Sequence, residues 1–214
     1  INIITYGQKN GSKWKINKIL DINNNKVLKL SIKNNNYLIP TALNSKFQIY
    51  NSVAAAAIAY ASGIPIENAL LSIRNLKSPH GRMQKVPNNL QYNIFVDYAH
   101  TPNAIKTILE EQKNFFSRLI LVIGCGGNRD ISKRAKIGNI ASKLCDKIII
   151  TDDNPRYENP SKIRQQIIQG IEKRFNKNVY EIADRKKAIS KAIELAKTDD
   201  TILIAGKGHE SIQI

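Results

Sequence analysis

The chain has 214 residues, of which 42% are hydrophobic and 7% aromatic, enough for one large or two small globular domains. Its 33 basic and 17 acidic residues give a formal net charge of +16, a value typical of nucleic-acid-binding proteins. The basic residues are nevertheless spread along the chain rather than gathered in one run, and Asn, Lys and Ile are abundant in loops and helices alike. We therefore attribute the charge to compositional bias and expect no nucleic-acid partner.

The two cysteines, Cys125 and Cys145, exclude a disulfide framework and have no further Cys or His at zinc-ligand spacing. The sequence contains no run of about 18 apolar residues and no basic-then-apolar export signal at its start. We expect a cytoplasmic protein with no membrane partner. Because the first residue is Ile1 rather than Met, we also expect the chain to be part of a longer protein.

The first 40 residues contain short apolar segments separated by turn residues, which is typical of an antiparallel meander. Strands are expected at 1–6, 14–20, 27–32 and 37–39. The spacing of apolar residues then indicates two helices. The first covers 49–62, is rich in alanine and ends at Gly63, and the second runs from Pro65 to Ile73.

From about residue 90, strand and helix patterns alternate regularly. Strands are expected at 94–96, 119–123, 147–151, 179–182 and 201–205, and helices at 102–115, 132–144, 161–175 and 185–197. Thr101-Pro102 and Asn159-Pro160 each place a capping side chain before a first-turn proline. The alternation predicts an α/β fold with a mostly parallel sheet and helices on both faces.

Polar segments follow four of these strands, at the end of such a sheet where ligands bind. They are 97–102, 124–130, 151–156 and 205–210. Two arginines, Arg129 and Arg156, and two acids, Asp153 and Glu210, would then share one site. Because guanidinium groups bind carboxylates and carboxylates bind ammonium groups, the site suits a zwitterionic ligand.

Each segment alone has an ordinary structural interpretation. The glycines of 124–127 fit either a tight turn or an anion-binding nest, and Arg129 stands where a dinucleotide fingerprint requires glycine. Asp153-Asn154-Pro155 is a common turn sequence. His100 and His209 fit loop histidines, and Cys125 lacks a nearby base that would make it a nucleophile. The prediction depends on the segments occurring together.

Together the segments carry a family resemblance that covers roughly residues 38–214. The motifs are Asp97-Tyr98-Ala99-His100-Thr101-Pro102, Gly124-Cys125-Gly126-Gly127-Asn128-Arg129-Asp130, Thr151-Asp152-Asp153-Asn154-Pro155-Arg156, Ala205-Gly206-Lys207-Gly208-His209-Glu210 and, upstream, His80-Gly81-Arg82-Met83. In this order they resemble the Mur ligases, and among these the branch that adds meso-2,6-diaminopimelate.

The resemblance implies a domain organisation and a reaction. Residues 1–88 would be the end of the central ATP-binding domain, and residues 89–214 the Rossmann-like C-terminal domain that binds the amino acid. The family uses ATP and magnesium to form an acyl phosphate, which the amine of the amino acid then attacks. The implied partners are meso-diaminopimelate and UDP-N-acetylmuramoyl-L-alanyl-D-glutamate, and we expect a monomer.

The resemblance also implies roles for individual residues. The amino acid would be held by Arg129, Asp153, Asn154, Pro155, Arg156, Gly206 and Glu210. Arg82 would reach the phosphates of ATP and Asp97 its ribose, with Asn51 and His100 on the adenine side. Arg156 would clamp the distal carboxylate of diaminopimelate and repel the ammonium of lysine. No catalytic residue and no metal ligand is assigned in this chain.

The sequence departs from the family pattern at several points. It has no P-loop signature, so magnesium ligands are expected mainly outside the chain, and the chain alone is not expected to catalyse ligation. Gln48 and Asn128 replace the usual asparagine and acidic residue, and the chain stops before the expected closing helix. Three alternatives stay open: a folylpolyglutamate synthetase-like ligase, a lysine-adding Mur ligase, and a catalytically dead basic binding module.

Overall fold

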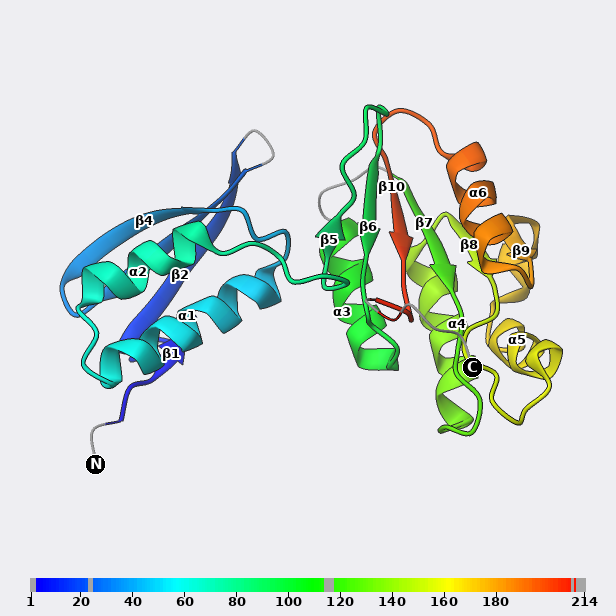
Figure 1. Cartoon of the computed structure of the whole chain (residues 1–214), viewed down its shortest axis with the longest axis horizontal. Coiled ribbons are helices and arrows are strands. Elements are labelled where there is room, and N and C mark those ends of the chain that lie inside the picture. The colour runs from blue at the N-terminus through cyan, green and yellow to red at the C-terminus, as the bar shows by residue number, and fades with distance from the viewer. Residues whose placement is uncertain (1–2, 23–24, 114–117, 209, 211–214) are drawn as a thin grey trace. The chain divides into compact units, whose positions relative to one another are not determined.

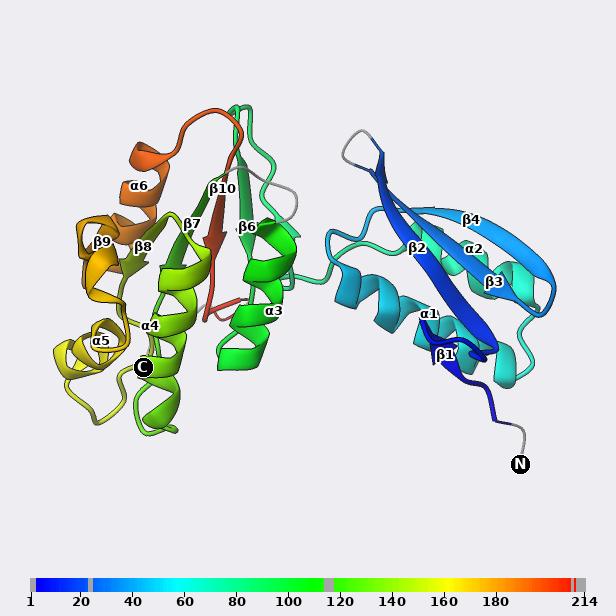
Figure 2. The same ribbon diagram turned by 180° about the vertical axis from the view of Figure 1, so that it is seen from behind.

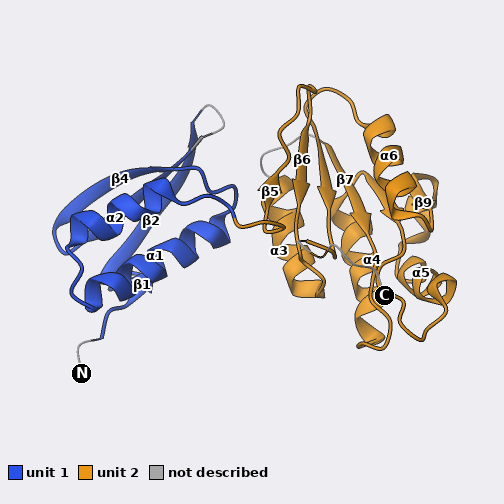
Figure 3. Cartoon of the chain, viewed as in Figure 1, with its two compact units in different colours: residues 1–78 blue, residues 79–214 orange. Residues whose placement is uncertain are grey.

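The computed structural model describes residues 3–22, 25–113, 118–208 and 210. The chain folds into two compact units, Ile1–Ser78 and Pro79–Ile214 (Figures 1 and 3). Within the described ranges, no helix is both long enough and apolar enough to cross a membrane.

The first unit contains a four-stranded sheet in the order β1-β2-β3-β4. Its strands are β1 (Tyr6–Gly7), β2 (Trp14–Ile22), β3 (Asn25–Ile32) and β4 (Asn35–Thr41). Strands β2, β3 and β4 form the predicted antiparallel meander. The prediction for the first strand was wrong, because β1 has two residues and pairs with β2 in parallel. Gly7 and Gly11 both have positive φ and return the chain so that Tyr6 lies beside Trp14 in the same direction.

Two helices pack on this sheet, α1 (Lys46–Ala61) and α2 (Ile66–Asn75). Their apolar side chains join those of the strands in one core, which includes Trp14, Leu30, Ile49, Val53 and Ile73. Helix α1 begins at a capping box: the Ser45 side chain accepts a hydrogen bond from Gln48 N, and Gln48 Oε1 accepts one from Ser45 N. Gln48, one of the departures from the family pattern, therefore fixes the start of the helix.

The second unit contains a six-stranded sheet in the order β5-β6-β10-β7-β8-β9. The strands are β5 (Gln84–Lys85), β6 (Asn93–Val96), β7 (Arg118–Ile123), β8 (Lys147–Ile150), β9 (Val179–Glu181) and β10 (Asp200–Ile204). All neighbouring strands are parallel except β5, which pairs antiparallel with β6. The five parallel strands are those predicted from the sequence, whereas the short β5 was not predicted.

Helices cover both faces of this sheet, as predicted. Helix α6 (Arg185–Leu195) packs Ala188 and Ala192 against one face. Helices α3 (Pro102–Lys113), α4 (Ser132–Leu144) and α5 (Pro160–Ile168) lie side by side on the other (Figure 2). These elements confirm the α/β fold class.

Two predicted helix starts are confirmed, and one predicted helix end is wrong. Asn159 Oδ1 accepts from the amides of Ser161 and Lys162, and Thr101 Oγ1 accepts from Ala104 N, so both predicted caps are confirmed. The helix predicted over 161–175 instead ends at Ile168 and is followed by a 3₁₀ helix, η1 (Lys173–Asn178). Just beyond the end of α5, Gly170 allows a close approach to α4, because a Cβ there would lie 1.9 Å from the Ala135 carbonyl oxygen.

The same approach makes Gly138 of α4 a sensitive position, because a Cβ there would lie 2.0 Å from the Ile167 carbonyl oxygen of α5. We predict that Gly138→Ala destabilises the chain by about 1–3 kcal/mol, although alanine is otherwise the better helix former by about 1 kcal/mol. Urea unfolding measures the change. The matched control is Lys136→Ala at an exposed position of α4, and equal stability of the two variants would contradict the close packing of α4 and α5.

Candidate functional site

The polar segments predicted to share a site do meet at one edge of the second sheet. Strands β6, β10, β7 and β8 are parallel neighbours, so their carboxyl ends lie at the same edge. A cavity of about 630 Å³ lies there. Its lining residues are Tyr98, His100, Thr101, Pro102, Gly126, Arg129, Asp130, Lys133, Asp153, Asn154, Arg156, Gly206 and Glu210.

Most of the predicted amino-acid-binding residues line this cavity. They are Arg129, Asp153, Asn154, Arg156, Gly206 and Glu210, joined by His100 from the predicted nucleotide side. Pro155, Arg82 and Asp97 lie outside the lining, Asn51 is exposed on α1 of the first unit, and His209 lies outside the described residues.

Several lining residues were not predicted. Tyr98, Thr101 and Pro102 belong to a motif already singled out, and Gly126 and Asp130 to another. Lys133 lies in the first turn of α4, and no pattern in the sequence distinguishes it from the other lysines of the chain.

Two loops of the site are joined by hydrogen bonds at Gly127. Gly127 N donates to Asn154 O at 2.8 Å, and Arg156 Nη1 donates to Gly127 O at 2.9 Å. A Cβ at Gly127 would lie only 1.9 Å from the Pro155 carbonyl oxygen, so the contact requires glycine at this position. The Gly-rich segment is therefore a close-packing element between β7 and β8.

An ion pair between a buried arginine and a partly exposed glutamate joins the same two loops. Arg134 on α4 is 0% exposed and binds both carboxylate oxygens of Glu158, at 2.7 and 2.9 Å. Its guanidinium also donates to Gln166 Oε1 and to Gly126 O, while Glu158 Oε1 accepts from Asn128 N at 2.5 Å. The bidentate geometry and the additional bonds are what a buried guanidinium needs to offset its desolvation.

The backbone has a positive φ at Arg156 and at the residue before Arg129. Asn128, which precedes Arg129, has φ 51°, and Arg156 has φ 52°. Asparagine adopts this left-handed conformation more readily than most residues, and Asn128 Oδ1 accepts from Tyr157 N at 3.0 Å. The asparagine at this departure from the family pattern thus supports the loop.

The acidic side of the cavity is formed by Asp153 and Glu210. Asp153 is 8% exposed and its Oδ1 accepts from Asn154 N at 2.7 Å. Behind these acids, Arg185 of α6 donates to Ala205 O at 2.9 Å. Burial lowers the pKa of the Arg185 guanidinium, and the charges of Asp153 and Glu210 oppose that shift, so Arg185 is a buried countercharge for both acids.

The Asp97 side chain holds backbone segments together in this fold. It is 2% exposed, and its two oxygens accept from Met83 N at 2.7 Å and Ala99 N at 2.6 Å. Burial raises the pKa of the Asp97 carboxyl, while the two amides and Arg82 lower it. Asp97 therefore ties the segment around Met83 to the end of β6, and its contact with a ribose stays a prediction.

The cysteines carry no nucleophilic chemistry. Cys125 is buried, and burial raises the pKa of its thiol to about 11, so the thiolate is scarce at neutral pH. Burial likewise raises the pKa of the Cys145 thiol. Within the part of the chain that the structure describes, no three His, Cys, Asp or Glu side chains are grouped as a metal site.

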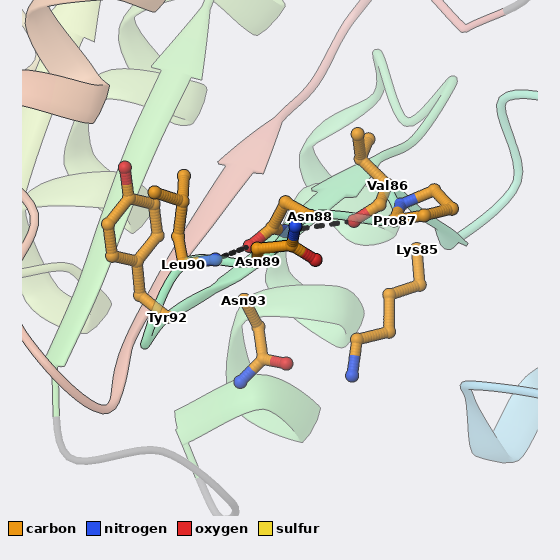
Figure 4. Close-up of a pocket in the computed structure, with 8 residues that line it drawn as sticks. All are labelled: Lys85, Val86, Pro87, Asn88, Asn89, Leu90, Tyr92 and Asn93. Carbon is orange, nitrogen blue, oxygen red and sulfur yellow. Dashed lines mark hydrogen bonds between the residues drawn. The ribbon is translucent and has the colours of Figure 1, made fainter.

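A second hollow, of about 420 Å³, lies at the opposite end of β6 (Figure 4). Its lining residues are Lys85, Val86, Pro87, Asn88, Asn89, Leu90, Tyr92 and Asn93, none of which was a predicted site residue. Asn88 donates to Val86 O at 3.0 Å and accepts from Leu90 N at 2.9 Å, as the close-up shows. The Asn88 side chain thus stabilises the turn itself.

Comparison with known proteins gives this geometry a family context. The family model described as "Mur ligase, glutamate ligase domain" matches residues 81–208, which include the whole strand-end site up to Gly208. A Rickettsia bellii protein named UDP-N-acetylmuramoyl-L-alanyl-D-glutamate–2,6-diaminopimelate ligase is 44% identical over 184 residues, covering 85% of this chain and 38% of the relative. The chain thus spans about two fifths of the length of the curated relatives it matches.

Solved structures extend the comparison. A structure titled as that same ligase is 32% identical, with a TM-score of 0.67, and covers 98% of this chain and 43% of the solved one. A folylpolyglutamate synthase from Thermotoga maritima has a TM-score of 0.66 at 22% identity, covering 91% of this chain and 43% of the other. The second likeness shows the fold alone.

The Arg134–Glu158 pair predicts a specific pH dependence of stability. Hydrogen bonds from Arg134 and from Asn128 N lower the pKa of Glu158 to about 2, whereas an unfolded chain has a glutamate pKa of about 4.3. The unfolded state therefore takes up the proton first as the pH falls, so the stabilisation is complete above about pH 5.5 and is lost towards pH 2.

We predict that Glu158→Gln lowers the urea midpoint at pH 7 and that its deficit relative to the wild type shrinks steadily from pH 5 to pH 2. The control is Glu110→Gln, which removes an exposed partner of Lys106 on α3 and should change the midpoint little at any pH. A deficit that stays constant over this pH range would contradict the ionic role of Glu158.

Proposed function

Because the chain belongs to the Mur ligase family, we propose that it is the amino-acid-binding part of an ATP-dependent ligase that joins meso-diaminopimelate to UDP-N-acetylmuramoyl-L-alanyl-D-glutamate. The observation that carries the proposal is the cavity at the strand ends, which brings two arginines and two acids together. The names of the relatives supply the substrates, and the cavity supplies a site of matching chemistry.

Diaminopimelate has two carboxylates and two amino groups, and the cavity has a partner for each kind. Arg129 and Arg156 provide guanidinium groups for the carboxylates, and Lys133 adds a third cation to the lining. Asp153 and Glu210 provide carboxylates for an amino group. A neutral or singly charged ligand would leave part of this set unpaired.

The chain's own contribution to ligation is positioning. ATP supplies an activated carboxyl group on the nucleotide precursor, and the residues described here hold the amine that attacks it. Arg82 and His100 are both exposed and close to Tyr98, where they could contact ATP phosphates and adenine. The magnesium ligands that the family uses are proposed to lie mainly outside this chain.

The domain assignment is part of this proposal. The sequence predicts the boundary between residues 88 and 89, whereas the compact units meet between Ser78 and Pro79. The first unit would be the end of the ATP-binding domain, with Asn51 available on the surface of α1, and the second the amino-acid domain. The remaining three fifths of the relatives' length would hold the other substrate sites.

The direct test uses the protein expressed from its complete gene, supplied with ATP, magnesium and UDP-N-acetylmuramoyl-L-alanyl-D-glutamate. We expect phosphate release that depends on meso-diaminopimelate, and a much lower kcat/KM with lysine. Preference for lysine would overturn the assigned substrate, dependence on glutamate and folate would favour the folylpolyglutamate synthetase-like alternative, and salt-sensitive nucleic-acid binding without turnover would favour the binding module.

Arg156 is the residue on which substrate identity depends. We predict that Arg156→Ala weakens the binding of meso-diaminopimelate by about 2 kcal/mol or more, because the distal carboxylate loses its charged partner. Turnover of lysine should rise, because the repulsion of its ammonium group is removed. Steady-state kinetics with both amino acids measures the change. The matched control is Lys162→Ala, which removes the same charge from an exposed position of α5. An unchanged KM for diaminopimelate would remove Arg156 from the site.

A further inference from the structure

One aromatic side chain contacts residues assigned to both halves of the site. The Arg82 guanidinium lies over the Tyr98 ring, with Cζ 4.6 Å from the ring centroid. The His100 ring meets the Tyr98 ring edge to face at 4.8 Å between centroids, and its Nδ1 lies 2.9 Å from Tyr98 O. On its other side, Tyr98 Oη donates to Glu210 Oε1 at 3.4 Å.

The backbone holds Tyr98 firmly in this place. It stands between Asp97 and Ala99, which are 2% and 4% exposed, and Asp97 Oδ1 accepts from Ala99 N. The segment after β10 also closes on the tyrosine, because a Cβ at Gly208 would lie 3.0 Å from Tyr98 Cβ and 2.7 Å from Gly81 O. Glycine at 208 therefore lets three segments meet at one side chain.

These contacts differ in chemical kind and in the group they orient. A cation over an aromatic ring is attracted to its face, so the ring restricts where the Arg82 guanidinium lies. A phenol donating to a carboxylate leaves the second carboxylate oxygen available for an ammonium group. One side chain therefore orients a phosphate-binding cation and an amine-binding anion at the same time.

We propose that Tyr98 is a positioning residue shared by the ATP side and the amino-acid side of the site. It sets the separation between Arg82 and Glu210 and thereby places the attacking amine relative to the activated carboxyl group. This inference rests on the proposed ligase function. It assigns to Tyr98 a role that neither the charge pattern nor the capping pattern of the sequence indicates.

The experiment compares Tyr98→Phe, Glu210→Gln and the double variant in the protein expressed from its complete gene. Tyr98→Phe keeps the ring under Arg82 and removes only the hydroxyl. We expect the KM for meso-diaminopimelate to rise about tenfold, the low end for a hydrogen bond to a charged group, with the KM for ATP unchanged. Because the hydroxyl acts through Glu210, the substitution should add less than twofold in the Glu210→Gln background.

A second variant tests the ring. Tyr98→Leu removes the surface under Arg82, so we expect it also to raise the KM for ATP and to lower kcat, which Tyr98→Phe does not. The matched control is Tyr157→Phe, because the Tyr157 side chain is 96% exposed at the rim of the same loops and should leave all constants unchanged. If Tyr98→Leu does not fold, as judged by thermal unfolding, the comparison of Tyr98→Phe, Glu210→Gln and the double variant tests the proposal alone.

The outcomes separate the two proposals. Wild-type protein that turns over meso-diaminopimelate, combined with effects of Tyr98→Phe and Glu210→Gln that simply multiply, overturns the role of Tyr98 and leaves the ligase function standing. Wild-type protein that adds no diaminopimelate overturns the proposed function and the role of Tyr98 with it. Turnover with a non-additive cycle supports both.

Discussion

The site depends on the interlocking of the loops that follow β7 and β8. Backbone hydrogen bonds of Gly127 join them, and the Arg134–Glu158 pair ties both to helix α4. Without this lock, the left-handed backbones at Asn128 and Arg156 would relax, since each costs about 1 kcal/mol or more in isolation. The placement of Arg129 relative to Arg156 therefore depends on the Arg134–Glu158 pair, which holds the two loops together.

The same physics divides the ionisable residues of the site into two groups. Asp97 and Glu158 use their carboxylate oxygens on backbone amides or on Arg134, so they hold the chain in place. Asp153 and Glu210 line the cavity, although Asp153 Oδ1 also accepts from Asn154 N. In the sequence Asp97, Asp153 and Glu210 look alike, because each follows a strand in a polar segment, and Glu158 lies two residues beyond one of these segments. Burial and the direction of nearby N–H groups separate them, and neither quantity is visible in a one-dimensional pattern.

Regular periodicity explains what the sequence did predict. The β-α alternation from residue 90 identified all five parallel strands, and the capping residues Asn159 and Thr101 marked two helix starts. The misses arise where tertiary contacts override local preference. Strand β1 pairs with β2 in parallel, after a turn through the positive-φ glycines Gly7 and Gly11, where the sequence predicted an antiparallel strand. Tyr98 and Lys133 were missed as site residues because only the folded sheet edge brings them beside Arg156.

In the proposed function, Arg156 could discriminate between diaminopimelate and lysine because its side chain is already held in place. Its Nη1 already donates to the carbonyls of Gly127 and Asn154, at 2.9 and 3.4 Å, so the side chain is held while the rest of its planar fork still has donors for a ligand. Little rotamer entropy is then lost when a carboxylate binds, whereas a flexible lysine at this position would have to be ordered first. In the proposed function, the same fixed charge could not move away from an ammonium group, so it would continue to repel a lysine ligand. Selectivity of this kind requires the loop lock, because an arginine free to move would accommodate both ligands.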